Sequence, residues 1–351
     1  MRSKDKQLNG MVTQIGKQWG GLIICLVCLT RTTFAQSLER FTFTEPHLGT
    51  IITLTLYASE ENAANEAARS AFLRVKELDL IFSDYKPDSE VMRLCQHAGS
   101  GQPVPVSPEL FQLLQRALVI SDQTQGAFDV TVGPLVQLWR RGRKQKTLPT
   151  PDEIAAAREL VGWKRIVLNP AQQTVELTKP GMRLDFGGIA KGFIAQQVSQ
   201  QLREQGFQQT LVAVAGDLVA GDAPPQKAGW RIGVAPLETP NGPPSRMLQL
   251  KNCAISTSGD AFQFVEIAGV RYSHIVDPQT GIGLTQQSSC TIIAKEGSTA
   301  DALATAVCIL GSARGLKLID SCEQTAGLLV TAIDGKPQTV ESKSFSEYDL
   351  P

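Results

Sequence analysis

Residues 297–310 read GSTADALATAVCIL and predict a buried helix around which the rest of the chain is organised. The alanines carry little bulk and favour helix. The larger apolar residues recur at the spacing of one helical face, so they form a stripe that packs into a core. That stripe consists of Leu303, Val307 and Leu310, and Ser298 or Thr299 can cap the first turn through a side-chain oxygen.

Asp301 and Thr305 share one face of this helix because they lie four residues apart. A carboxylate and a hydroxyl offer the hard oxygen ligands that Mg²⁺ prefers, and a helix start presents free amides to phosphate. The alternative is structural, with Asp301 facing the helix dipole in the first turn and Thr305 bonding its own backbone. The pair alone leaves both interpretations open.

The composition of the 351 residues indicates a soluble globular protein of one large domain or two smaller ones. The 34 basic residues balance the 34 acidic ones, and no basic run is interleaved with aromatic residues. Nucleic acid is therefore not an expected partner.

The N-terminus predicts a Sec-type signal peptide. Basic residues precede the apolar run 22–29, which is too short to span a membrane, and small residues at 33 and 35 fit signal peptidase. Cleavage after Ala35 divides the chain into a signal peptide, 1–35, and a mature domain, 36–351. We expect an exported, periplasmic protein. Two alternatives stay open: a start at Met11, and an uncleaved anchor in the inner membrane, which Arg31 favours.

Export leaves five cysteines in the mature chain. Their odd number and irregular spacing do not form a disulfide framework, and no cluster has zinc spacing. Cys253, Cys290 and Cys308 lie in apolar runs, so we expect them to be buried thiols.

Most predicted strands follow one another through hairpins or loops rather than regular βαβ units, which indicates an α+β fold in one catalytic domain. Helical periodicity predicts helices over 60–82, 89–94, 108–124, from 150 onward, and over 189–205. Strand patterns cover 40–57, 165–168, 174–177, 183–186, 210–214, 230–234, 248–256, 262–267, 289–294 and 327–333.

Gly187 and Gly188 join the short strand 183–186 to a helix, an arrangement that can cradle phosphate. The spacing fits neither the Walker A motif nor the dinucleotide GxGxxG motif.

His274 and Asp277 flank a Pro-Gln-Thr-Gly turn. Histidine can act as a base near neutral pH, and a nearby carboxylate can orient it. The alternative is a loop histidine with a purely structural hydrogen bond, although the chain has only three histidines.

Five blocks stand in order along the chain: AFDVTVGPL at 127–135, DFGGIAKG at 185–192, STSGD at 256–260, HIVDPQTG at 274–281 and ADALATA at 300–306. Together they resemble the ApbE family, the FAD:protein FMN transferases. The resemblance covers nearly all of the mature chain from about Phe41 onward, and five ordered blocks are far more specific than any one.

The resemblance implies an ApbE-like, T-fold-related architecture of antiparallel sheet with packed helices. It also implies Mg²⁺-dependent transfer of FMN from FAD to a threonine or serine hydroxyl of an acceptor protein, with release of AMP. Family acceptors are flavin-carrying subunits of membrane redox complexes and related exported proteins.

The same resemblance carries residue roles onto this sequence. It implies that Asp301, Thr305 and the backbone carbonyl of Gly188 are the metal ligands. It also implies that His274 handles the proton of the acceptor hydroxyl. The implied FAD contacts are Leu48, Tyr85, Ala127, Phe128, Asp129, Asp185, Lys191 and Ile275.

Three positions depart from the family pattern, with Gln279 in place of Arg, Cys95 in place of Asn, and Ala215-Gly216 in place of Gly-Gly. None of them removes a metal ligand. Two other functions stay open: an FAD pyrophosphatase that yields FMN and AMP, and a non-catalytic periplasmic flavin-binding protein.

Overall fold

An eight-stranded sheet, in which every neighbouring pair is antiparallel, forms the centre of the fold. Its order is β1 (Glu39–His47), β2 (Thr50–Ala58), β6 (Thr210–Val214), β7 (Asp217–Ala220), β10 (Cys253–Gly259), β13 (Ser288–Ala294), β14 (Ala326–Ile333) and β15 (Lys336–Glu341). Tight turns join β1 to β2, β6 to β7 and β14 to β15, whereas the other neighbouring strands are joined by longer segments, the longest of which, between β2 and β6, contains most of the helices. The predicted α+β class with a largely antiparallel sheet is therefore confirmed.

The computed structural model describes residues 37–239, 241–261 and 263–350. Ser37–Pro351 form one compact unit, and the predicted signal peptide lies outside the described residues. Within them, Cys95, Cys253, Cys290, Cys308 and Cys322 are free thiols. Cys290 and Cys308 are buried as expected, whereas Cys253 is only partly buried.

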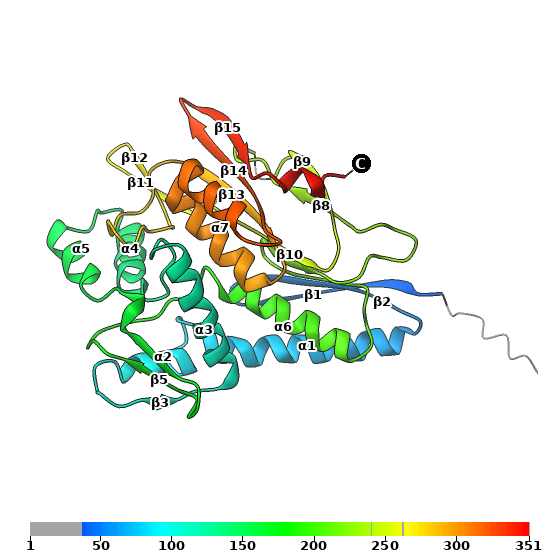
Figure 1. The fold of residues 1–351 in the computed structure, drawn as a ribbon, viewed down its shortest axis with the longest axis horizontal. Helices are drawn as coiled ribbons and strands as arrows, with labels where there is room; N and C mark the ends of the chain where they lie inside the picture. The colour runs from blue at the N-terminus through cyan, green and yellow to red at the C-terminus, as the bar shows by residue number, and fades with distance from the viewer. Residues whose placement is uncertain (1–36, 240, 262, 351) are drawn as a thin grey trace, which may run out of the picture. The chain divides into compact units, whose positions relative to one another are not determined.

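Three long helices cover one face of the sheet (Figure 1): α1 (Glu61–Phe82), α6 (Ala190–Glu204) and α7 (Gly297–Gly311). The helix expected over 297–310 is α7, and it packs against α6, β10 and β13. Gly297–Ser321 is long and apolar enough to cross a membrane. Its α7 portion is apolar because it is the core helix of this domain, with every residue from Gly297 to Ala304 buried.

The opposite face of the sheet carries a second apolar cluster. The hairpin β8 (Trp230–Val234) and β9 (Arg246–Leu250) places Trp230 and Leu248 against sheet residues such as Ile255. A three-stranded sheet of β3 (Val104–Pro105), β5 (Thr174–Leu177) and β4 (Ile166–Asn169), and the hairpin β11 (Phe264–Ile267) with β12 (Val270–Ser273), complete the strands.

Three of the other helices begin where the sequence contains capping residues. Ser89 caps α2 (Glu90–Gln96), Ser107 caps α3 (Pro108–Gln123), and Thr150 forms a capping box with α5 (Pro151–Arg158). Short connections are η1 (Trp163–Arg165), η2 (Ser312–Leu316), α8 (Lys317–Ser321) and η3 (Phe345–Tyr348).

One helix was not predicted and two local expectations were wrong. The helix is α4 (Gly133–Gln145), which begins with Gly-Pro and has no side-chain cap. The predicted strand 183–186 is reduced to one bridge between Val132 and Arg183. Neither Ser298 nor Thr299 caps α7: the Gly297 amide donates to the Gln196 side chain of α6 at 3.2 Å, and Thr299 accepts hydrogen bonds from the Arg116 guanidinium.

Candidate active site at the junction of α6 and α7

Asp301 lies at the contact between α6 and α7. Its carboxylate is 1% exposed and accepts a hydrogen bond from the backbone amide of Gly192 at 3.1 Å. The Lys191 ammonium lies 3.4 Å from both of its oxygens. Asp301 is past the first turn of α7, so the interpretation as a first-turn dipole residue is wrong.

Asp217 at the start of β7 is the second carboxylate of this cluster. It lies 2.8 Å from the Lys191 ammonium and accepts a hydrogen bond from the Ser256 hydroxyl. Burial, together with the nearby Asp217 carboxylate, raises the pKa of Asp301, and Lys191 opposes that rise. Burial alone would lower the pKa of Lys191, but the attraction of the two carboxylates outweighs it and raises that pKa.

Thr305 presents its hydroxyl to the glycine loop before α6. A Cβ added at Gly188 would lie 3.0 Å from Thr305 Oγ1, so only glycine lets this backbone approach the hydroxyl without crowding it. Thr305 Oγ1 is hydrogen-bonded to Ser258 Oγ at 3.0 Å rather than to its own helix backbone. The structural alternative for Thr305 is therefore also wrong.

These groups fit a hard divalent cation. Among the described residues, no three or more His, Cys, Asp or Glu side chains form a metal-binding group. A cation here would depend on a mixed oxygen set, with the Asp301 carboxylate, the Thr305 hydroxyl and the Gly188 carbonyl as donors. Such oxygen donors suit Mg²⁺, which keeps several of its waters and takes few protein ligands.

His274 follows β12 and is held by the backbone of Gln263. Its Nδ1 lies 3.1 Å from the Gln263 carbonyl oxygen. A carbonyl can only accept, so Nδ1 carries the hydrogen and Nε2 is left with a free lone pair. Burial lowers the pKa of His274 to about 4, assisted by the positive charges of Arg143 and Lys191. His274 is therefore neutral at pH 7 and can accept a proton.

The expectation that Asp277 orients His274 was wrong. The Asp277 carboxylate accepts from the Gln279 amide at 2.8 Å and from the Thr280 hydroxyl at 3.1 Å, so it closes the turn instead. The Gln263 carbonyl orients His274 instead. The β11–β12 hairpin brings the two residues together, so no residue next to His274 in the sequence indicates this contact.

A second group surrounds Tyr85, whose side chain is 75% exposed. The Arg140 guanidinium on α4 lies 4.3 Å from the centre of the Tyr85 ring. The same guanidinium pairs with Asp185 at 3.0 Å and with Asp84. Asp185 also accepts from the Gly187 amide at 2.8 Å, so Arg140 connects the tyrosine to the glycine loop. Burial and the nearby Asp84 raise the pKa of Asp185.

The other predicted FAD contacts lie in packed surroundings. The Asp129 carboxylate accepts from the Thr131 amide and hydroxyl and from the Trp163 amide, so it fixes its loop internally. Ala127, Phe128 and Ile275 are buried, and Leu48 packs partly buried in the turn between β1 and β2 with a φ of 55°. The structure thus brings Gly188, Lys191, Asp301 and Thr305 together, and groups Tyr85 with Asp185 through Arg140.

The departures from the family pattern have local consequences. Ala215 has a φ of 55°, so an alanine adopts the left-handed conformation that glycine takes without strain. The Gln279 side chain reaches the Gln125 carbonyl at 3.3 Å. The Cys95 sulfur accepts from the Leu184 amide at 3.3 Å.

Sequence reasoning missed Asp217 and Arg140 as members of these groups. The only signal for Asp217 is a lone acid within the apolar run 210–220, directly after the Ala215-Gly216 turn. Arg140 had no distinguishing signal, because it is one of several basic residues on α4.

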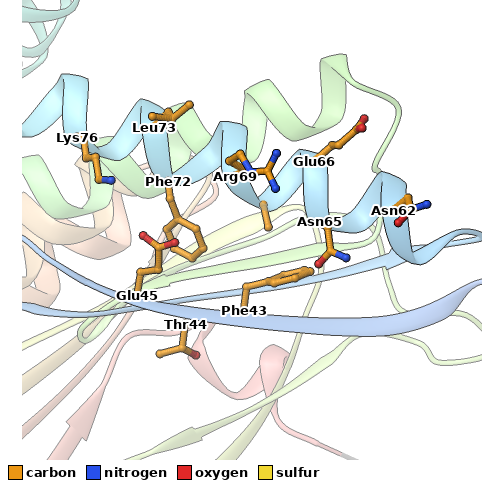
Figure 2. Close-up of a pocket in the computed structure, with 11 residues that line it drawn as sticks. Phe43, Thr44, Glu45, Asn62, Asn65, Glu66, Arg69, Phe72, Leu73 and Lys76 are labelled. Atoms are coloured by element: carbon orange, nitrogen blue, oxygen red, sulfur yellow. The ribbon is translucent and has the colours of Figure 1, made fainter.

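A separate concavity of about 550 Å³ lies between β1 and α1 (Figure 2). Phe43 and Phe72 form part of its wall, and Asn65, Arg69 and Lys76 lie along the helix side. It shares no residue with the groups around Asp301, His274 or Tyr85, so it is not part of the candidate active site.

Comparison with known proteins identifies relatives over most of the chain. The profile of the ApbE family matches residues 48–329. The FAD:protein FMN transferase of Treponema pallidum is 31% identical over 315 residues, covering 85% of this chain and 87% of the relative. That of Vibrio cholerae is 29% identical over 314 residues, covering 88% and 93%.

Solved structures show the same fold. The flavin transferase ApbE from Vibrio cholerae superposes with a TM-score of 0.78 at 28% identity, covering 89% of this chain and 100% of that one. The apo form of the Pseudomonas stutzeri flavinyl transferase ApbE gives a TM-score of 0.79 at 29% identity, covering 89% and 97%.

Proposed function

Because this chain belongs to the ApbE family, we propose that it transfers FMN from FAD to a threonine or serine hydroxyl of an acceptor protein and releases AMP. Dependence on Mg²⁺ is part of the proposal. The observation that carries it is the approach of Gly188 to Thr305, beside the buried Asp301 and Lys191. Gly188 and Lys191 come from one block of the sequence, and Asp301 and Thr305 come from another. Together they place oxygen ligands and the Lys191 ammonium group in one location.

Asp301, Thr305 and the carbonyl of Gly188 would hold the metal. When bound, Mg²⁺ would neutralise charge on the diphosphate of FAD and on the departing AMP. The Lys191 ammonium and the amides at the start of α6 provide further positive potential for phosphate.

His274 provides the path for the proton. The acceptor oxygen forms a bond to the phosphorus of the FMN moiety, and the bond from that phosphorus to the bridging oxygen breaks. AMP leaves with the bridging oxygen, while the hydroxyl proton passes to Nε2 of His274. The bond between Nδ1 and the Gln263 carbonyl keeps Nε2 as the basic nitrogen.

Tyr85 offers an exposed aromatic face of the kind on which an isoalloxazine ring can stack. Arg140 restrains that face and ties it to Asp185 and the glycine loop. The flavin and diphosphate ends of FAD would thus be positioned by connected groups, which favours one orientation of the scissile bond.

The test uses the mature chain, FAD, MgCl₂ and a candidate acceptor, followed by mass spectrometry of the acceptor. We expect FMN on a threonine or serine and one AMP for each FMN transferred. Free FMN with an unmodified acceptor would instead indicate hydrolysis of FAD, and bound FAD with no turnover would indicate a binding protein. A reaction in EDTA serves as the control for the metal.

The proposed acceptor is a subunit of a membrane redox complex or a related exported protein, so the enzyme is proposed to act in the periplasm. The apolar run 22–29 and the small residues before Gln36 support export. N-terminal sequencing of the exported protein should begin at Gln36. A membrane-bound form that retains Met1 or Met11 would contradict cleavage.

A further inference from the structure

Two buried carboxylates share one ammonium at the junction of α6 and α7. Asp217 is 3% exposed and Asp301 is 1% exposed. Among the described residues, the only cationic side chain paired with either of them is Lys191. With both carboxylates ionised, the cluster carries one more negative than positive charge. Buried charge of this kind is costly unless a cation compensates it.

The ammonium of Lys191 is not shared equally. It lies 2.8 Å from Asp217 but 3.4 Å from each oxygen of Asp301. Asp217 is fixed by the Ser256 hydroxyl, whereas Asp301 is fixed on one oxygen by the Gly192 amide. The closer contact is therefore with the carboxylate that the proposed metal does not use.

A divalent cation and the Lys191 ammonium would compete for the same oxygens of Asp301. We propose that Lys191 is the counter-ion of Asp301 in the metal-free protein, and that Asp217 is the positioning residue that retains the ammonium when the cation binds. This inference rests on the proposed metal ligands Asp301, Thr305 and Gly188. It assigns Asp217 a role in metal affinity without contact to the metal.

The arrangement predicts opposite effects for two substitutions. Lys191→Met removes the competing charge, so a divalent cation should bind more tightly. Asp217→Asn leaves the ammonium with Asp301 as its only carboxylate partner, so the cation should bind more weakly. A purely structural role for the two residues would weaken binding in both variants, because either change would disorder Asp301.

The experiment titrates the flavin-free mature chain with Mn²⁺, a hard cation suited to carboxylate and carbonyl ligands, and measures free Mn²⁺ by electron paramagnetic resonance. We expect the Kd to fall at least about fivefold in Lys191→Met and to rise at least about fivefold in Asp217→Asn, the low end of usual coupling between sites. Lys179→Met is the matched control, because Lys179 pairs at 3.2 Å with the exposed Glu159. Its Kd should equal that of the wild type.

Kd changes of the same sign in the two variants, or no change in either, would overturn the inference. A loss of about a hundredfold or more in Asp217→Asn would also overturn it, by making Asp217 a metal ligand. If Lys191→Met fails to fold, the double variant Lys191→Met/Asp217→Asn keeps the net charge of the cluster. Its Kd should not exceed that of the wild type, and a higher value would contradict the competition.

The outcome separates this inference from the proposed function. Asp301→Ala should lose Mn²⁺ binding, and wild-type affinity in that variant would reject the proposed ligands. If Asp301→Ala loses binding while the Lys191 and Asp217 variants match the wild type, the ligand assignment stands and only the counter-ion inference fails.

Discussion

Gly192 in α6 and Gly297 at the start of α7 approach so closely that a Cβ on either residue would lie 2.1 Å from the carbonyl oxygen of the other. This contact has a direct consequence for the candidate active site. It brings the Gly192 amide within 3.1 Å of the Asp301 carboxylate and places Lys191 beside it. The two glycines thus set the distance between the start of α6 and the proposed metal ligands on α7.

We predict that Gly192→Ala destabilises the protein, although alanine is the better helix former by about 1 kcal/mol. Overpacking of a tight contact costs about 1–3 kcal/mol, so the steric effect exceeds the gain in helix propensity. Urea unfolding should show a lower free energy of unfolding. Gly216→Ala is the control, because a Cβ there meets its nearest atom at 3.4 Å, and an equal loss in both variants would reject the argument.

Asp301→Ala is expected to abolish Mg²⁺-dependent FMN transfer, because it removes the only charged ligand of the proposed set. Thr305→Val should be milder, since it removes a neutral ligand and the bond to Ser258. Transfer rates measured over a range of Mg²⁺ concentrations test both. Asp222→Ala changes an exposed carboxylate and is the control. Wild-type turnover of a folded Asp301→Ala variant at limiting Mg²⁺ would refute the assignment.

His274→Asn should reduce the rate of transfer by about 10²–10⁴-fold, the usual contribution of a positioned base. Asparagine keeps some hydrogen bonding but cannot accept the proton, so FAD affinity should stay close to that of the wild type. Single-turnover transfer at saturating FAD, together with an FAD-binding titration, separates the two effects. Loss of affinity with an intact saturated rate would make His274 a binding residue.

The pH dependence of transfer follows from the environment of His274. Only the neutral imidazole can accept the proton, and burial lowers the pKa of His274 to about 4. The rate should therefore rise with pH through that value and be constant between about pH 6 and 8. Single-turnover rates across this range are the measurement. An inflection near the ordinary histidine pKa of about 6.5 would show that burial does not lower the pKa of the group that acts as the base.

Arg140→Gln should weaken FAD binding, because the guanidinium restrains the Tyr85 ring and the Asp185 carboxylate. Each hydrogen bond to a charged group contributes about 1.5–3 kcal/mol, so we expect the Kd for FAD to rise about tenfold. Fluorescence titrations with FAD and with AMP separate a loss of affinity at the flavin end of the ligand from a loss at its nucleotide end. Arg141→Gln breaks an exposed pair with Glu153 and is the neighbouring control. Equal losses of FAD affinity in the two variants would show that Arg140 has no special role in FAD binding.

The helices with clear caps and one apolar face could be predicted from the sequence, because these signals are local. Ser89, Ser107 and Thr150 cap the helices that follow them. α4 was missed because it begins with Gly-Pro, has no side-chain cap and carries many basic residues. The spacing of Asp301 and Thr305 fixed their common face on α7, and the ordered motifs indicated the family.

The partners of these residues were decided only by the tertiary structure. Lys191 and Asp217 are separated by one helix, one strand and a turn, yet their charged groups lie 2.8 Å apart because α6 packs on the sheet beside β7. The orientation of His274 likewise depends on Gln263, from the opposite side of the β11–β12 hairpin. Local sequence determines where a side chain lies on its helix or strand, whereas long-range packing determines which charge it meets and how far its pKa moves.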